Sequence, residues 1–129
     1  MSRKNKLKRN RQIITVQFTN AECRVMFNAM ECLIFDAYEL GMDIPARIAS
    51  ATNSGYEKLK NYDLTDDVPN EIGEFPLTYN EMCGALYACN LILEDYDEDE
   101  LPNRREEITS LKEKLRNYLS KIHSIYTGA

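Results

Sequence analysis

Apolar residues recur at helical spacing in three stretches, which predict long amphipathic helices at about residues 20–40, 79–95 and 104–126. The three apolar stripes comprise, in turn, Cys23, Met26, Phe27, Met30, Leu33, Ile34 and Ala37; Met82, Ala85, Leu86, Cys89, Ile92, Leu93 and Tyr96; and Ile108, Leu111, Leu115, Tyr118, Leu119, Ile122, Ile125 and Tyr126. Further apolar residues lie off the first two stripes, so we expect both of those helices to be covered on more than one side. The predicted fold is a compact, mainly helical domain.

The first two helices begin in the same way. Thr19 is followed by Glu22 and Thr78 by Glu81, and a Thr with a Glu three residues later predicts a capping box at each helix start. Residues 13–18 are β-branched and alternating, which predicts a short strand before the first helix. Their counterpart, residues 72–77, contains Pro76 and could form only an edge strand. The chain thus contains two similar units of strand, Thr-x-x-Glu and helix, and the fold is α+β if both strands form.

The segment between the two units is less regular. Pro45 suits a first helical turn and predicts a helical stretch within residues 45–61, which we expect Asn53, Ser54 and Gly55 to interrupt. Residues 63–76, with two prolines, one glycine and five acids, predict a long loop. At 129 residues and 43% hydrophobic content, we expect one domain over residues 12–129 that buries a core without metals or disulfides.

The net charge of −5 divides unevenly along the chain. Residues 1–11 carry a charge of +6 with no acid, whereas residues 12–129 carry ten basic and twenty-one acidic side chains, or −11. We expect residues 1–11 to be a disordered basic tail that is solvated and does nothing specific, or else an arm that contacts nucleic acid. The cations of this tail are Arg3, Lys4, Lys6, Lys8, Arg9 and Arg11.

Acidic residues concentrate in two places. Residues 94–100 hold six carboxylates at the end of the second predicted helix, where the helix dipole disfavours negative charge. They form either a solvated connection or, together with the acids of the long loop, an acidic face for a basic partner. The residues predicted for that face are Glu94, Asp95, Tyr96, Asp97, Glu98, Asp99, Glu100, Asp63, Asp66, Asp67, Glu71 and Glu74.

A calcium loop is a third interpretation of the same region. The acidic or amide side chains at positions 1, 3, 5, 9 and 12 of an EF-hand spacing are Asp95, Asp97, Asp99, Asn103 and Glu106. Position 6, where the turn requires Gly, is Glu100, and position 8 is Pro102, which has no amide to pair with a sister loop. Residues 63–74 match this spacing less well, so the sequence favours no resident metal.

Catalytic chemistry has little support in the sequence. The chain has one histidine, His123, which we expect at the edge of a helix stripe, and it lacks a phosphate-binding glycine loop, a nucleophile elbow and a His-Glu metal pattern. The four cysteines have no paired spacing, so we expect reduced thiols and no zinc site. Without a secretory signal or a membrane-spanning run, we expect a cytoplasmic protein that needs no cofactor.

These observations favour a non-catalytic interaction protein. Our leading hypothesis is that it binds, and inhibits or regulates, a protein with a basic nucleic-acid-binding surface. Its composition is similar to that of small counter-defence or regulatory proteins of phages and mobile elements. The alternatives are a nucleic-acid-associated accessory protein acting through residues 3–11 and a calcium-responsive helical protein. Off-stripe apolar residues such as Phe35 also favour a homo-oligomer.

Overall fold

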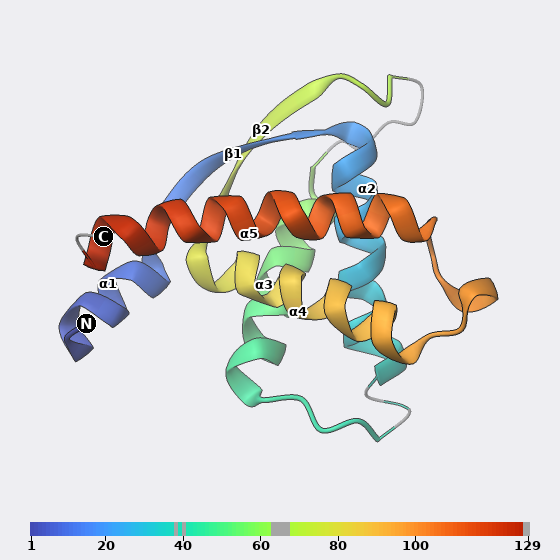
Figure 1. Ribbon diagram of the computed structural model, residues 1–129, viewed down its shortest axis with the longest axis horizontal. Coiled ribbons are helices and arrows are strands. Elements are labelled where there is room, and N and C mark those ends of the chain that lie inside the picture. The colour runs from blue at the N-terminus through green and yellow to red at the C-terminus, as the bar shows by residue number, and fades with distance from the viewer. Residues whose placement is uncertain (38, 40, 63–67, 128–129) are drawn as a thin grey trace.

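The computed structural model describes residues 1–37, 39, 41–62 and 68–127, and its fold is mainly helical, as predicted (Figure 1). The elements, in chain order, are α1 (Arg3–Arg11), β1 (Ile13–Thr19), α2 (Asn20–Glu31), the π-helix η1 (Cys32–Ala37), α3 (Ala46–Lys60), β2 (Ile72–Thr78), α4 (Tyr79–Asp95), the 3₁₀ turn η2 (Glu98–Glu100) and α5 (Arg105–Thr127). The three long predicted helices and both predicted strands are therefore present.

β1 and β2 pair as an antiparallel ribbon, which is the only sheet in the described residues. Ile13 lies opposite Thr78 and Thr19 opposite Ile72, so each strand leads into its helix at an opposite end of the ribbon. Val16 and Phe18 are fully buried, whereas the alternate residues of β1 face outward. The ribbon thus covers one side of the helices with one apolar face.

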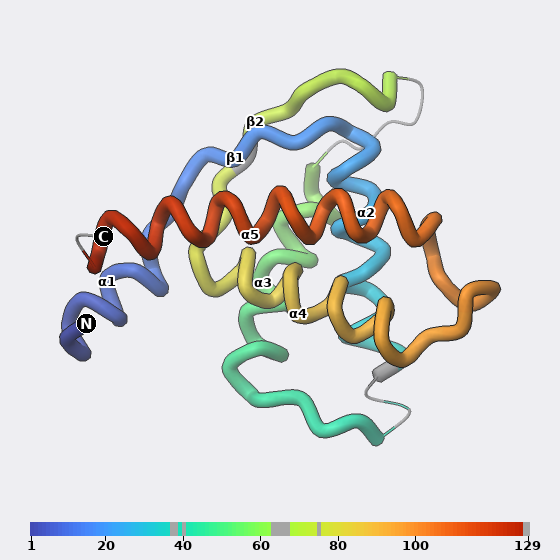
Figure 2. The backbone as a smooth tube through the Cα atoms, viewed as in Figure 1, coloured from blue at the N-terminus to red at the C-terminus, as the bar shows by residue number. Residues whose placement is uncertain are grey.

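Helix α4 lies at the centre of the fold. It packs against α2, α3 and α5, and α5 runs alongside α4 and crosses α2 (Figure 2). Its fully buried apolar residues are Met82, Ala85, Ala88, Cys89 and Ile92. Because buried residues lie around more than one side of this helix, the prediction that it is covered on several faces is confirmed.

The predicted interruption of α3 is wrong, because the helix continues through Asn53, Ser54 and Gly55. Gly55 serves close packing instead of a turn: a Cβ there would lie 2.7 Å from the Cε of Met30. Gly84 of α4 approaches α3 more tightly, since its Cβ would lie 3.0 Å from the backbone N of Thr52 and 2.6 Å from its Oγ1. Small residues on both helices therefore allow their backbones to lie close together.

The first long helix changes character along its length. It is α-helical to Glu31 and continues as the π-helix η1 to Ala37, while residues 38 and 40 lie outside the described residues. Leu33 of η1 is buried, but Phe35 is 52% exposed and lies edge-on to Tyr56, with 6.0 Å between ring centroids. The homo-oligomer inferred from such residues stays a prediction.

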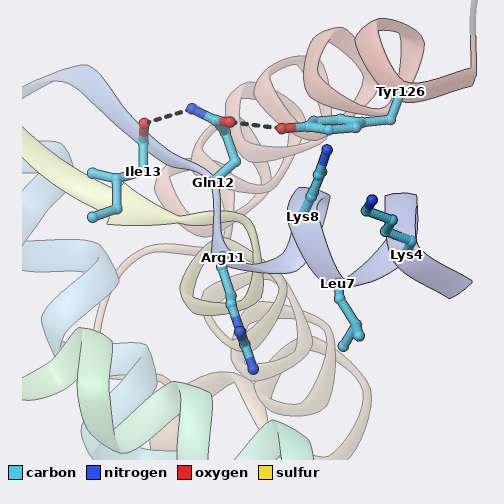
Figure 3. Close-up of a pocket in the computed structure, with 7 residues that line it drawn as sticks. All are labelled: Lys4, Leu7, Lys8, Arg11, Gln12, Ile13 and Tyr126. Carbon is cyan, nitrogen blue, oxygen red and sulfur yellow. Dashed lines mark hydrogen bonds between the residues drawn. The ribbon is translucent and has the colours of Figure 1, made fainter.

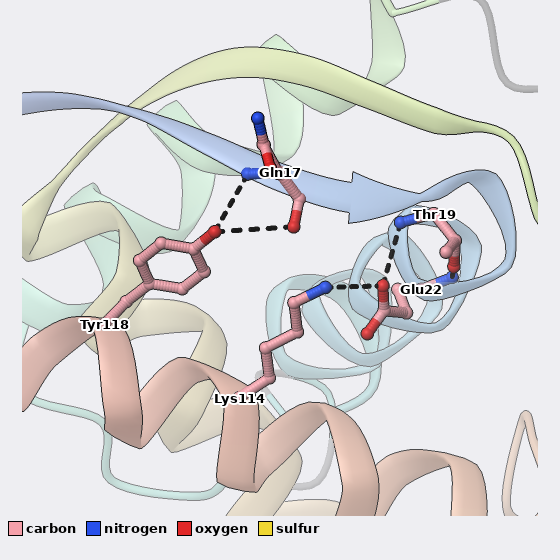
Figure 4. Close-up of polar contacts among 5 residues, drawn as sticks. All are labelled: Gln17, Thr19, Glu22, Lys114 and Tyr118. Atoms are coloured by element: carbon pink, nitrogen blue, oxygen red, sulfur yellow. Dashed lines mark hydrogen bonds and ion pairs between the residues drawn. The ribbon is translucent and has the colours of Figure 1, made fainter.

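Both predicted capping boxes are present. The Thr19 hydroxyl accepts from the Glu22 amide at 3.1 Å and the Glu22 carboxylate accepts from the Thr19 amide at 2.8 Å; the same pair of bonds joins Thr78 and Glu81 at 3.0 and 2.8 Å. Each glutamate also binds a lysine of another helix. In α5, Lys114 donates to Glu22 at 2.8 Å (Figure 4), and Lys58 of α3 donates to Glu81 at 2.6 Å. The two caps therefore join helices as well as begin them.

The first eleven residues differ from the predicted disordered tail, because residues 3–11 form helix α1. Ser2 caps it by accepting from the Asn5 amide at 3.1 Å. Arg9 holds it against the domain: its guanidinium lies 4.4 Å from the ring centroid of Tyr79, and its Nη1 lies 3.3 Å from Nδ1 of His123. Composition alone could not reveal these contacts, because they join α1 to distant segments and bury no apolar side chain of α1.

We expect Gly84→Ala to destabilise the fold by about 1–3 kcal/mol, because the new methyl group would displace the backbone of α3 at Thr52. Gly55→Ala is the matched control. Its Cβ meets the movable end of Met30, and Ala is the better helix former by about 1 kcal/mol, so this variant should lose less stability. Chemical denaturation measures both values, and an equal or larger loss for Gly55→Ala would contradict the packing described here.

We expect the buried carboxylate of Glu81 to make stability depend on pH. Burial opposes its ionisation, but hydrogen bonds from Lys58, Ser54 and the Thr78 amide outweigh burial and lower its pKa below the ordinary 4.5. Its contribution is therefore complete above pH 4.5 and is lost as the pH falls through the lowered value.

Glu81→Gln tests this contribution. It should cost about 1.5–3 kcal/mol at pH 7 and flatten the loss of stability below pH 4.5. The exposed Glu57→Gln is the control, and denaturation curves between pH 3 and 7 provide the measurement. Identical pH profiles for Glu81→Gln and the intact chain would show that this carboxylate does not carry the dependence.

Candidate functional sites at the two charged ends

The chain places opposite charges at opposite ends of its long axis (Figure 1). Arg9 of α1 stacks on Tyr79, the first residue of α4, and the acidic segment 94–100 begins in the last turn of the same helix. The rise of α4 separates these points by about 24 Å, at 1.5 Å per residue. Each end is therefore a distinct candidate site.

The acidic end is built on a short, self-supported turn. Glu94 and Asp95 are exposed in the last turn of α4. Asp97 is the N-cap of η2: its carbonyl accepts from the Glu100 amide at 2.9 Å, and its own amide donates to the Glu100 carboxylate at 2.9 Å. Glu98 forms an ion pair with Arg105 at 2.9 Å. The backbone here is ordered by its own carboxylates, and most of their charge remains turned to solvent.

Tyr96 lies within this turn and connects it to η1. Its hydroxyl donates to the Asp36 carboxylate at 3.1 Å, and its pKa is raised, first by burial and then by neighbouring Cys32 and Asp36. Asp36 thereby joins the predicted acidic residues, although the sequence analysis did not include it. Its only signal in the sequence is that it precedes Asp95 by 59 residues, the same offset that separates Thr19 from Thr78 in the two similar units. We call the acidic end Asp36 together with residues 94–100.

The second predicted acidic group lies elsewhere. Glu71 precedes β2, where its carbonyl accepts from the Asn20 amide at the start of α2, and Glu74 lies on the ribbon, accepting from Gln17 at 2.8 Å. Asp36 is sixteen residues beyond Asn20 along a helical segment, a separation of about 20 Å. The single acidic face that we predicted is therefore not formed by these residues. The remaining predicted members, Asp63, Asp66 and Asp67, lie outside the described residues.

The EF-hand residues are not brought together. Asp97 is engaged in capping η2, and Glu106 is exposed in the first turn of α5. Among the described residues, no group of three or more His, Cys, Asp or Glu side chains is arranged to hold a metal ion, and this includes Asp95 and Asp99. The acids match a calcium spacing along the sequence, but without Gly at position 6 the chain does not wrap them around one point.

The basic end consists of α1 and its neighbours. Lys4, Lys8 and Arg11 line an open cavity of about 570 Å³, closed on one side by Tyr126 of α5 (Figure 3). Arg11 also lines a second cavity of about 360 Å³ between α1, α3 and the start of α4, where Arg47 contributes another cation. Arg47 and Tyr126 were missed by the sequence analysis, because nothing in their local sequence links them to α1.

The four cysteines are free thiols, as expected. Burial raises the pKa of Cys23 and Cys89 to about 12 and that of Cys32 to about 11, and it also raises the pKa of Cys83. At neutral pH these side chains remain protonated, and a protonated thiol is neither a good nucleophile nor a metal ligand.

Comparisons with known proteins give no further guide to function. No protein-family model matches the chain, and neither the curated proteins nor the solved structures yielded a match. In the part of the chain that the structure describes, every helix is too short or too polar to cross a bilayer. The function is therefore argued from the geometry of the two charged ends.

Proposed function

We propose that this chain is a non-catalytic protein–protein interaction module that binds a basic protein surface through its acidic end. The observation that carries the proposal is the position of Tyr96, held by Asp36 at the centre of a turn rich in exposed carboxylates. Complementary charge accelerates association of two proteins, and a partly buried aromatic residue can contribute much of the binding free energy.

The electrostatics of the acidic end favour a cationic partner. Among the ion pairs of the described residues, this end has one, between Glu98 and Arg105, and that pair is largely exposed. The carboxylates of Glu94 and Asp95 also lie at the negative end of the α4 dipole, where they cost helix stability. A cationic partner would offset this unfavourable interaction between the carboxylates and the helix dipole. Binding would then be more favourable by the energy recovered.

A nucleic-acid-binding protein is the partner class that we propose. Its surface carries Lys and Arg side chains arranged to contact phosphates, and clustered carboxylates compete for the same cations. Occupation by the acidic end would exclude nucleic acid, so binding would inhibit or regulate the partner. A counter-defence role in a phage or mobile element is one biological setting that fits this activity.

The proposal predicts that the variant Glu94→Gln/Asp95→Asn/Asp99→Asn loses its partner. These three substitutions leave intact the η2 cap formed by Asp97 and Glu100 and the pair formed by Glu98, so the turn should keep its structure. We expect binding to weaken more than tenfold, because three charges at the interface are removed. The measurement is affinity capture from a nuclease-treated lysate of the source cells, followed by identification of the captured protein and titration with it.

The control variant Glu57→Gln/Glu71→Gln/Glu113→Gln makes the same change in net charge on other surfaces. It should capture the same nucleic-acid-binding protein as the intact chain. If both triple variants lose the partner equally, total charge and not the acidic end is responsible. If neither loses it, binding occurs elsewhere and the proposal is wrong.

A further inference from the structure

Three cations of α1 form one stripe. Lys4, Lys8 and Arg11 are spaced i, i+4 and i+7 and therefore share a helix face, while Arg9 on another face holds the helix to Tyr79. The stripe is about 10 Å long, which is the axial rise of about three nucleotides of one strand. Because α1 is already docked, Lys4 and Lys8 lie on the side of Tyr126 before any ligand arrives, whereas Arg11 extends away from Tyr126 and also lines the second cavity (Figure 3).

The cations of this end are available to a ligand. Among the described residues, no carboxylate forms an ion pair with Lys4, Lys8, Arg11 or Arg47. The single carboxylate among the described residues lining the two cavities is that of Glu81, which already binds Lys58. Arg11 lines both cavities, so a positively charged path continues from α1 toward Arg47 on α3.

An aromatic ring borders the same stripe. The Tyr126 hydroxyl donates to Gln12 at 2.6 Å, and Gln12 donates to the Ile13 carbonyl at 3.2 Å, which holds the ring beside Lys8 (Figure 3). Leu7 and Ile13 line this cavity too and are 46% and 58% exposed. Cations that lie beside an aromatic ring and apolar side chains are the combination with which proteins bind single-stranded nucleic acid.

We propose that the basic end binds single-stranded nucleic acid, with the phosphates on Lys4, Lys8 and Arg11 and one base stacked on Tyr126. In a duplex the base faces are stacked on one another and unavailable to the tyrosine, whereas a single strand presents them. The net negative charge of the chain does not prevent binding. The acidic end lies about 24 Å away, roughly three Debye lengths at physiological salt.

This inference is independent of the proposed protein partner, because it uses the opposite end of the molecule. The test is the fluorescence anisotropy of a labelled fifteen-nucleotide oligothymidylate, titrated with the full chain between 50 and 200 mM salt. Three phosphate contacts predict a slope of about −2 in the logarithmic salt dependence. No binding at 50 mM salt, or tighter binding of the matching duplex, would overturn the proposal.

Two variants of α1 with equal charge locate the contact. Lys4→Gln/Lys8→Gln should weaken binding about tenfold and reduce the slope to about −0.7, since one phosphate contact remains. Arg3→Gln/Lys6→Gln removes the same charge from residues that line neither cavity, and it should weaken binding less than threefold. Equal losses in the two variants would contradict a defined site.

Two substitutions of Tyr126 separate stacking from hydrogen bonding. Tyr126→Leu should weaken binding about tenfold, whereas Tyr126→Phe keeps the ring, loses only the hydrogen bond to Gln12 and should weaken binding less than threefold. Equal behaviour of these two variants would overturn the stacking role. Glu94→Gln/Asp95→Asn/Asp99→Asn should bind the oligonucleotide at least as tightly as the intact chain, so failure at one end is distinguishable from failure at the other.

Discussion

The buried carboxylate of Glu81 is the interaction on which the rest of this structure depends. It lies in the first turn of α4, accepts from the amide of Thr78, the last residue of β2, and accepts hydrogen bonds from Ser54 and Lys58 of α3. One side chain therefore joins three elements. Because α4 is the centre of the helical layer, its start position sets where the other helices pack. The side chain of Glu81 is 3% exposed, and an unpaired carboxylate there would be costly, so losing its partners would destabilise the junction of these three elements.

A capping glutamate that also binds a lysine of another helix occurs twice in the fold, and the two glutamates differ in burial. Glu22 caps α2 and binds Lys114 of α5, but its side chain is 25% exposed, so its charge is better solvated than that of Glu81. The antiparallel ribbon places the two caps at opposite ends of its length. The two ends of α4 therefore carry different charges. The basic helix α1 docks where α4 begins, and the acidic turn follows where α4 ends. Opposite charges at the two ends are a consequence of the fold.

Local patterns in the sequence were sufficient for most of the fold. Helical periodicity and the two Thr-x-x-Glu boxes predicted α4 to the residue, since both depend on neighbours within one or two turns. The errors have a common cause. Gly55 was taken for a helix interruption and α1 for a disordered tail, because close helix packing and the contact of Arg9 with Tyr79 are tertiary. The cavity at the basic end could not be predicted from the sequence either, since Tyr126 reaches α1 only when the chain is folded.

The central claim is that the two charged ends act as separate sites, and an amide NMR titration of the ¹⁵N-labelled chain tests it most directly. Oligothymidylate should shift the resonances of residues 4–13 and of Tyr126 and leave residues 94–100 unchanged. A lysine- and arginine-rich peptide should produce the reverse, with Asp36 among the shifted residues. Shifts at both ends with each ligand, or shifts spread along the chain, would contradict the account.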